Sequence, residues 1–197
     1  MTDRTTIEQD LAFLRQAAED GARLSMPGVP YYILWGLVSA LANGLVYLSL
    51  SGALPLSPTW IWGSAGAAAS VLMLWLIWRD EQHPEARKFL NRAVGLIWGT
   101  TGGAAFVLVF GVSLSGADPA LIGPVIAVCL GIPFIVFANM AGPRWMTVPG
   151  FGWWIAAAVM FAMHDRLESV LIMAAAAVMF MVLPGLALLR LTGARMV

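Results

Sequence analysis

The sequence predicts an all-α integral membrane protein: six transmembrane helices, arranged as three consecutive hairpins, behind a short amphipathic helix. Of its 197 residues, 60% are hydrophobic and 11% are charged, whereas a soluble chain carries about 25% charged residues. Six apolar segments are each close to the roughly 20 residues that cross a bilayer. They cover residues 30–50, 59–78, 93–114, 119–140, 148–164 and 167–189. We therefore divide the chain into an N-terminal segment, 1–28, and a six-helix bundle, 29–197.

Residues 1–28 form the only long polar segment, and their pattern predicts a cytoplasmic amphipathic helix. Thr5 and Glu8 fit a capping box, and apolar residues follow at helical spacing. The polar face carries more acidic than basic residues, which argues against a helix lying on anionic lipid. We expect this helix to pack beneath the bundle, and docking against a partner protein is the alternative.

The distribution of basic residues predicts the orientation of the bundle. If all six segments cross the membrane, ten of the eleven lysines and arginines fall on the side that holds both termini. Arg166 alone falls on the opposite side. Basic residues stay cytoplasmic during insertion, so we expect both termini in the cytoplasm. An odd number of spans would destroy this bias. Five spans with a re-entrant segment at 148–164 remain the alternative, because that segment is the shortest.

A weak internal repeat supports the three hairpins. Trp35-Gly36 opens the first span and Trp98-Gly99 the third, while Trp153-Trp154 stands near the start of the fifth. These spans have the same predicted direction, which three copies of one hairpin would produce. The alternative is coincidence, because tryptophan and glycine are frequent in spans.

Small residues recur every four positions on several spans, and we interpret them as helix-packing residues. In lipid, close backbone contact between helices matters more than burial of apolar surface, and small residues permit it. Gly95, Gly99 and Gly103 form one such row in the segment 89–111, which we expect neighbouring helices to press against. The other rows are Gly36, Ala40 and Gly44; Gly63 and Ala67; and Gly123, Ala127 and Gly131. A tight pore or a dimer face is the alternative.

The apolar segments contain no pattern that indicates catalysis. No ionisable residue falls in the central third of a span, whereas coupled transporters place one there. No nucleophile–base pair or cofactor motif is visible, so we predict no catalytic or cofactor-binding residue. A layer of hydroxyl groups (Ser39, Ser70, Thr100 and Thr101) falls at one predicted depth. It would bind a polar ligand or, as is more usual, bond to neighbouring helices or its own helix carbonyls.

The non-cytoplasmic side carries a small set of polar residues. His164 and Asp165 lie in one turn, with Glu168 after them and Asp118 in another turn. Histidine and carboxylates bind metal ions, but such residues also cap helices and face water at the ends of spans. We favour capping and solvation, and therefore predict no metal ligand.

Three short motifs resemble a known family. The N-terminal Asp10-Leu-Ala-Phe-Leu-Arg-Gln-Ala-Ala-Glu-Asp-Gly21, the later Trp35-Gly36 and the closing Leu183-Pro184-Gly185-Leu186-Ala187-Leu188 resemble small uncharacterised proteobacterial inner-membrane proteins. The resemblance implies a similar architecture and a bacterial inner membrane, and it implies no activity.

Together these features favour a non-catalytic accessory, scaffold or sensor subunit. The lipid bilayer is one partner, and we expect residues 1–28 and 79–92 to contact a cytoplasmic or membrane protein. A homo-oligomer is also compatible with the sequence. The zero net charge gives no indication of nucleic-acid binding. A small passive channel or carrier is the alternative function.

Overall fold

The computed structural model describes residues 29–80, 85–140 and 143–193, and these residues are helical with no strand. The α-helices are α2 (Val29–Leu50), α3 (Pro58–Asp80), α4 (Glu85–Ser115), α5 (Ile122–Met140), α6 (Thr147–Ala162), α7 (Ser169–Ala177) and α8 (Leu183–Gly193). A 3₁₀ turn precedes α5 (η1, Pro119–Leu121) and another precedes α6 (η2, Arg144–Met146), while a π-helical segment (η3, Val178–Val182) joins α7 to α8.

These elements form six helices that are long and apolar enough to cross a membrane. The predicted fold, a multi-span α-helical membrane protein, is thereby confirmed. The predicted N-terminal amphipathic helix, 1–28, lies outside the described residues.

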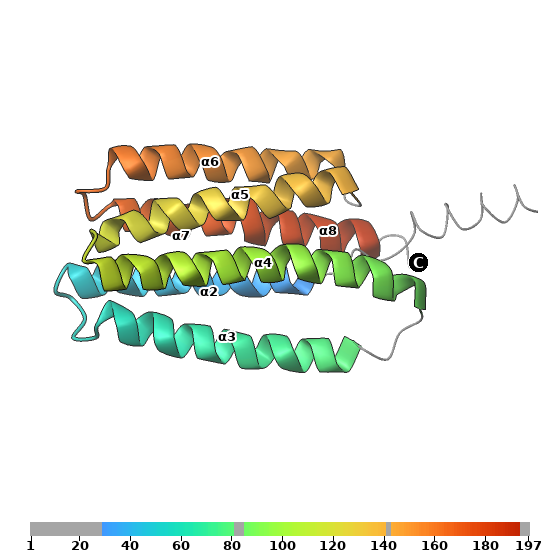
Figure 1. Cartoon of the computed structure of the whole chain (residues 1–197), viewed down its shortest axis with the longest axis horizontal. Coiled ribbons are helices and arrows are strands. Elements are labelled where there is room, and N and C mark those ends of the chain that lie inside the picture. Colours follow the sequence, from blue (N-terminus) through green and yellow to red (C-terminus); the bar gives the residue numbers. More distant parts are fainter. Residues whose placement is uncertain (1–28, 81–84, 141–142, 194–197) are drawn as a thin grey trace, which may run out of the picture.

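The six long helices run side by side along one axis and alternate in direction (Figure 1). The α2–α3, α4–α5 and α6–α7 turns lie together at the left-hand end of Figure 1. The C-terminal end of α3 and the start of α6 lie at the opposite end. Polar residues in the second and third of these turns are therefore brought to one end of the bundle.

The structure bears on two of the predicted spans, the third and the fifth. α4 begins at Glu85, eight residues before the predicted start at 93, so the charged sequence there continues the helix. The fifth span, Arg144–Ala162, is helical over its 19 residues and runs antiparallel to α5. It is long and apolar enough to cross a membrane, which favours six spans over the re-entrant alternative.

The core of the bundle lies among α2, α5, α6 and the α7–α8 helix. Its largest fully buried side chains are Trp153, Phe134, Phe137, Met146, Met160 and Leu188. Tyr32 of α2 joins this core, with its ring 5.5 Å from that of Phe134. α3 and α4 flank the core: α3 packs mainly on α2, and α4 mainly on α5.

The last span changes its helical winding where α2 packs against it. Pro184 has no backbone N–H to donate to the carbonyl of Phe180, and the helix is π-helical over Val178–Val182, ending two positions before this proline. Met181 and Val182 of this segment contact Gly36. The widened turn therefore lies at the α2 contact.

Candidate functional site

Two of the predicted packing glycines lie at tight helix crossings. A Cβ placed on Gly36 would lie 2.8 Å from both Met181 Cβ and Val182 Cγ2. A Cβ on Gly131 would overlap the indole of Trp154 and lie 2.8 Å from the carbonyl oxygen of Gly150. Both positions require glycine, because real Cβ atoms do not approach their neighbours this closely.

Of the other predicted residues on α2 and α5, the two alanines are packed and the two glycines have looser surroundings. Ala127 is fully buried, and Ala40 is half-buried against the core. A Cβ on Gly123 would be in ordinary contact with Met160 Sδ, at 3.9 Å, and one on Gly44 would meet no described atom within 4 Å. These two glycines are therefore not required by the contacts of the described residues.

The glycine row of α4 is not covered by the described part of the chain. Side-chain positions on Gly95, Gly99 and Gly103 would meet no described atom within 4 Å. No residue from Gly95 to Ser115 is buried. The expectation that neighbouring helices press against this row is therefore wrong for the described helices of the chain.

The row Gly95, Gly99 and Gly103 also lies outside the face of α4 that other helices cover. The half-buried residues of α4 include Ile97, Thr101 and Ala105, which repeat every four positions and so mark the covered face. Gly99 follows Ile97 by two positions, which is about 200° around an α-helix. Trp98, which is also half-buried, lies about 100° from Gly99, so the row Gly95, Gly99 and Gly103 lies beside and away from the covered face.

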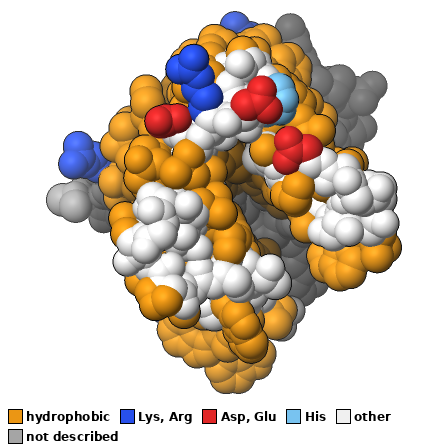
Figure 2. All heavy atoms as spheres, turned by 90° about the vertical axis from the view of Figure 1, so that its left-hand side faces the viewer, with side chains coloured by type: hydrophobic (Ala, Val, Ile, Leu, Met, Phe, Trp, Pro, Cys, Tyr) orange, Lys and Arg blue, Asp and Glu red, His pale blue; other side chains and the backbone are white. Residues whose placement is uncertain are grey.

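α3 is nearly as uncovered as α4. Only Ile61 and Ala69 are buried between Pro58 and Arg79. Side-chain positions on Gly63 and Gly66 would also meet no described atom within 4 Å. A hollow opens between α4 and the α2–α3 hairpin at the end of the bundle that faces the viewer in Figure 2. We call α3 and α4 the uncovered pair.

Each helix of the uncovered pair is attached to α2 by an indole hydrogen bond. Trp35 Nε1 of α2 donates to Met73 Sδ of α3 over 3.3 Å. Trp98 Nε1 of α4 donates to the Tyr32 hydroxyl of α2, also over 3.3 Å. The Trp98 ring packs 5.1 Å from that of Tyr32 and 5.4 Å from that of Phe134. α2 therefore contacts both helices of the uncovered pair, while α4 packs mainly on α5.

The two threonines of the predicted hydroxyl layer form hydrogen bonds within their own helix, α4. Thr100 Oγ1 donates to the carbonyl of Leu96 over 2.7 Å, and Thr101 Oγ1 to that of Ile97 over 2.8 Å. Ser39 is buried on α2, and its carbonyl accepts from the Asn43 side chain. The alternative of bonding within the same helix is confirmed for the two threonines.

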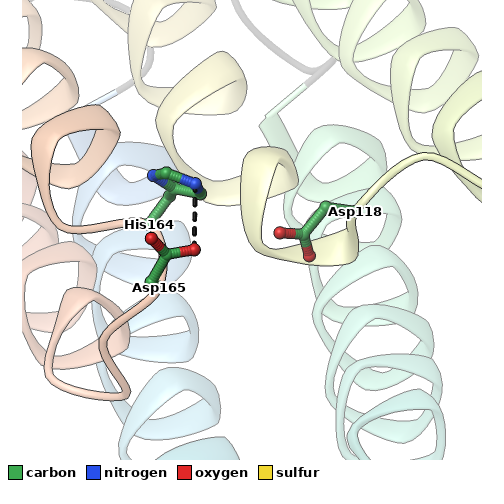
Figure 3. Close-up of side chains that lie close together, drawn as sticks. All are labelled: Asp118, His164 and Asp165. Atoms are coloured by element: carbon green, nitrogen blue, oxygen red, sulfur yellow. Dashed lines mark ion pairs between the residues drawn. The ribbon is translucent and has the colours of Figure 1, made fainter.

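At the left-hand end of Figure 1, two turns bring polar side chains together. Asp118 comes from the α4–α5 turn, and His164 and Asp165 come from the α6–α7 turn (Figure 3). One ligand atom from each lies within 4.8 Å of the others. We call these three residues the rim cluster. Glu168, which the sequence placed in the same region, is not part of this group.

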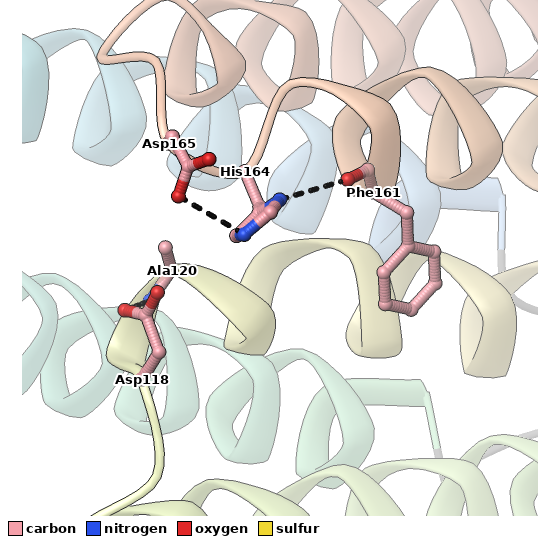
Figure 4. Close-up of polar contacts among 5 residues, drawn as sticks. All are labelled: Asp118, Ala120, Phe161, His164 and Asp165. Carbon is pink, nitrogen blue, oxygen red and sulfur yellow. Dashed lines mark hydrogen bonds and ion pairs between the residues drawn. The ribbon is translucent and has the colours of Figure 1, made fainter.

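Specific contacts orient each member of the rim cluster (Figure 4). Asp118 caps η1, because its Oδ1 accepts from the Ala120 N–H over 2.9 Å. His164 Nδ1 lies 3.1 Å from the carbonyl oxygen of Phe161, and its Nε2 lies 3.0 Å from Asp165 Oδ1. The expected capping role is confirmed for Asp118. The metal-ligand geometry is the feature that sequence reasoning rejected.

Sequence reasoning also missed three packing glycines. Gly150 faces the carbonyl oxygen of Gly131 across the α5–α6 crossing, Gly152 faces the ring of Phe180, and Gly185 faces Ile33. They do not form a row at four-residue spacing, so the pattern used to find packing residues passed over them. Comparison of the chain with protein-family models, curated proteins and solved structures finds no match.

Proposed function

We propose that the protein is a non-catalytic accessory subunit that associates laterally, within the bilayer, with a transmembrane helix of another membrane protein through the uncovered pair. The observation that carries this proposal is the glycine row of α4, Gly95, Gly99 and Gly103, which no described residue covers.

Glycine is unfavourable on a helix surface that only lipid covers. A glycine in a helix costs about 1 kcal/mol relative to alanine, and acyl chains gain nothing from the missing side chain. A second helix does gain, because glycines at four-residue spacing let two backbones approach and make van der Waals contact. The row therefore matches the surface of a close helix–helix contact whose other half is another polypeptide.

The proposed orientation places both termini in the cytoplasm of a bacterial cell, with the protein in the inner membrane. It rests on the bias of basic residues, since ten of eleven fall on the side of the termini. Residues 1–28 and 79–92 would then offer the partner a second, cytoplasmic contact.

Native mass spectrometry of the protein extracted gently from its own membrane tests this function. We expect a heteromeric complex for the wild type and its loss in the double variant Gly99→Leu/Gly103→Leu. The control is Ala104→Leu, which places a leucine at another exposed position of α4 and should keep the complex. Because nothing described lies within 4 Å of either glycine's side-chain position, the double variant should still fold.

Two outcomes would contradict the proposal. The first is a complex that survives in the double variant, because the contact would then lie elsewhere. The second is a wild-type protein that carries no second polypeptide. That result would favour the passive channel or carrier, to be tested by ion and solute flux in liposomes. Deleting residues 2–24 measures separately how much the cytoplasmic segment contributes to the complex.

A further inference from the structure

The contacts of His164 set the orientation of its imidazole within the rim cluster. A backbone carbonyl can only accept, so the 3.1 Å contact of His164 Nδ1 with Phe161 O requires the hydrogen on Nδ1. In the neutral ring Nε2 then carries a lone pair, and this nitrogen faces Asp165 Oδ1 at 3.0 Å. A metal ion between Nε2 and Oδ1 would be bound by both of these lone pairs.

The far side of the imidazole is held as it is in metal sites. A histidine that binds a metal through one nitrogen usually donates the other N–H to a backbone carbonyl or carboxylate, which fixes the tautomer and the ring orientation. Phe161 O plays this part for His164. Nε2 is thereby aimed toward the carboxylates of Asp165 and Asp118 (Figures 3 and 4).

The third member is contributed by a different hairpin and is also held in place. Asp118 uses Oδ1 to cap η1, and Pro119 follows at the first position of that turn. A carboxylate offers about four lone-pair sites, so capping leaves capacity to bind a cation. Three potential ligands therefore converge from two turns that are separated in sequence.

We propose that Asp118, His164 and Asp165 bind a divalent transition-metal ion of the Zn²⁺ type. One imidazole nitrogen and two carboxylate oxygens, with water in the remaining position, form a set that Zn²⁺ accepts. Zn–N and Zn–O bonds of about 2.0–2.2 Å place neighbouring tetrahedral ligands about 3.3 Å apart. The 3.0 Å separation of Nε2 and Oδ1 is close to this value. The Asp118 carboxylate has an oxygen within 4.8 Å of the other two ligand atoms. It would move closer to them to bind the same ion.

The ligand chemistry also selects among ions. Ca²⁺ takes six to eight oxygen ligands, and Mg²⁺ prefers oxygen and keeps most of its water. A nitrogen ligand and only two carboxylates suit neither ion. Imidazole favours zinc and its first-row neighbours.

A bound ion would close the open end of one hairpin. α5 and α6 are joined at the η2 end of the bundle, and Asp118 and His164 lie at the opposite end of the same two helices. The ion would link the start of α5 to the end of α6. This inference concerns a different part of the molecule from the proposed partner contact and does not depend on it.

The test uses the full chain in nanodiscs of phosphatidylcholine, with an affinity tag that contains no histidine. His83→Gln serves as the background, which leaves His164 as the only histidine. The probe is Co²⁺, whose visible absorption reports ligation. We expect binding of one Co²⁺ per chain, displacement by Zn²⁺, and a shift of the His164 Nε2 resonance in ¹⁵N NMR on addition of Zn²⁺.

Variants then assign the ligands. Asp118→Asn, His164→Gln and Asp165→Asn should each weaken Co²⁺ binding at least about tenfold. Asparagine is itself a good helix cap, so Asp118→Asn should keep the α5 start intact. Glu168→Gln is the matched control: it removes an exposed carboxylate from the same turn region, outside the rim cluster, and should leave binding unchanged.

Three results would overturn the proposal. One is the absence of Co²⁺ binding by protein whose circular dichroism shows the helical fold. Another is equal binding by wild type and His164→Gln. The last is displacement of Co²⁺ by Ca²⁺ at the same concentration, which would indicate unselective attraction to surface carboxylates.

Discussion

The core helices and the uncovered pair use the same Trp–Gly dipeptide in opposite ways. In α2, Trp35 bonds to Met73 and Gly36 packs against Met181 and Val182. In α4, Trp98 bonds to Tyr32, but Gly99 meets no described atom within 4 Å. The indole anchors its helix in both cases. The glycine is used for packing within the described chain only in α2.

This difference shows that a small-residue row identifies a face suited to close packing without identifying what covers it. The core of α2 and α5–α8 fulfils that packing within the chain. α4 presents the same kind of face on its outer side, and the proposed function assigns it to another protein. Paired substitutions in the two regions test this difference.

The largest contrast is expected between two phenylalanines. Phe134 of α5 is fully buried, whereas Phe106 of α4 is 63% exposed and contacts Phe110 of its own helix. Phe134→Ala leaves a cavity among packed side chains and should lower the unfolding free energy by about 3 kcal/mol or more. Phe106→Ala should cost less than about 1 kcal/mol, because lipid can fill the space.

Unfolding by SDS titration in mixed micelles, followed by circular dichroism, measures both values. Equal losses would mean that α4 is covered in the isolated protein, and the distinction between the core and the uncovered pair would fail.

The second contrast uses the two Trp–Gly glycines. Gly36→Ala places a methyl group 2.8 Å from Met181 Cβ and 3.1 Å from the backbone nitrogen of Val182. Overpacking of this kind costs about 1–3 kcal/mol. Gly99→Ala meets open space and gains helix propensity, so its stability should be unchanged or slightly higher in the same SDS titration. Destabilisation of the isolated chain by Gly99→Ala would contradict the open face.

The sequence was sufficient for the fold because six long apolar segments have one stable solution in a bilayer, the helix. It was insufficient for the packing, because the row at Gly95, Gly99 and Gly103 looks like the row at Gly123, Ala127 and Gly131. Which face is covered depends on tertiary placement, and Gly150 and Gly185 show that tight contacts also occur outside such rows. The rim cluster could not be predicted for the same reason, since Asp118 and His164 are neighbours only after two hairpins have folded.

The smallest contrast tests how α4 is attached to α2. Tyr32→Phe keeps the ring that packs on Phe134 but removes the hydroxyl that accepts from Trp98 Nε1. Hydrogen bonds between membrane helices contribute about 0.6 kcal/mol on average, which corresponds to roughly threefold more opening of the contact. Hydrogen exchange of α4 amides in nanodiscs should rise by about this factor, while α6 exchange stays constant.

Tyr47→Phe is the matched control, because it removes a hydroxyl from the other end of the same helix. If it accelerates α4 exchange as much as Tyr32→Phe, the effect belongs to α2 as a whole. If neither variant changes α4 exchange, the ring contacts of Trp98 with Tyr32 and Phe134 hold α4 without the hydrogen bond. In the expected case, one hydroxyl sets how readily α4 separates from the core, and hence how firmly the glycine row is held for a partner helix.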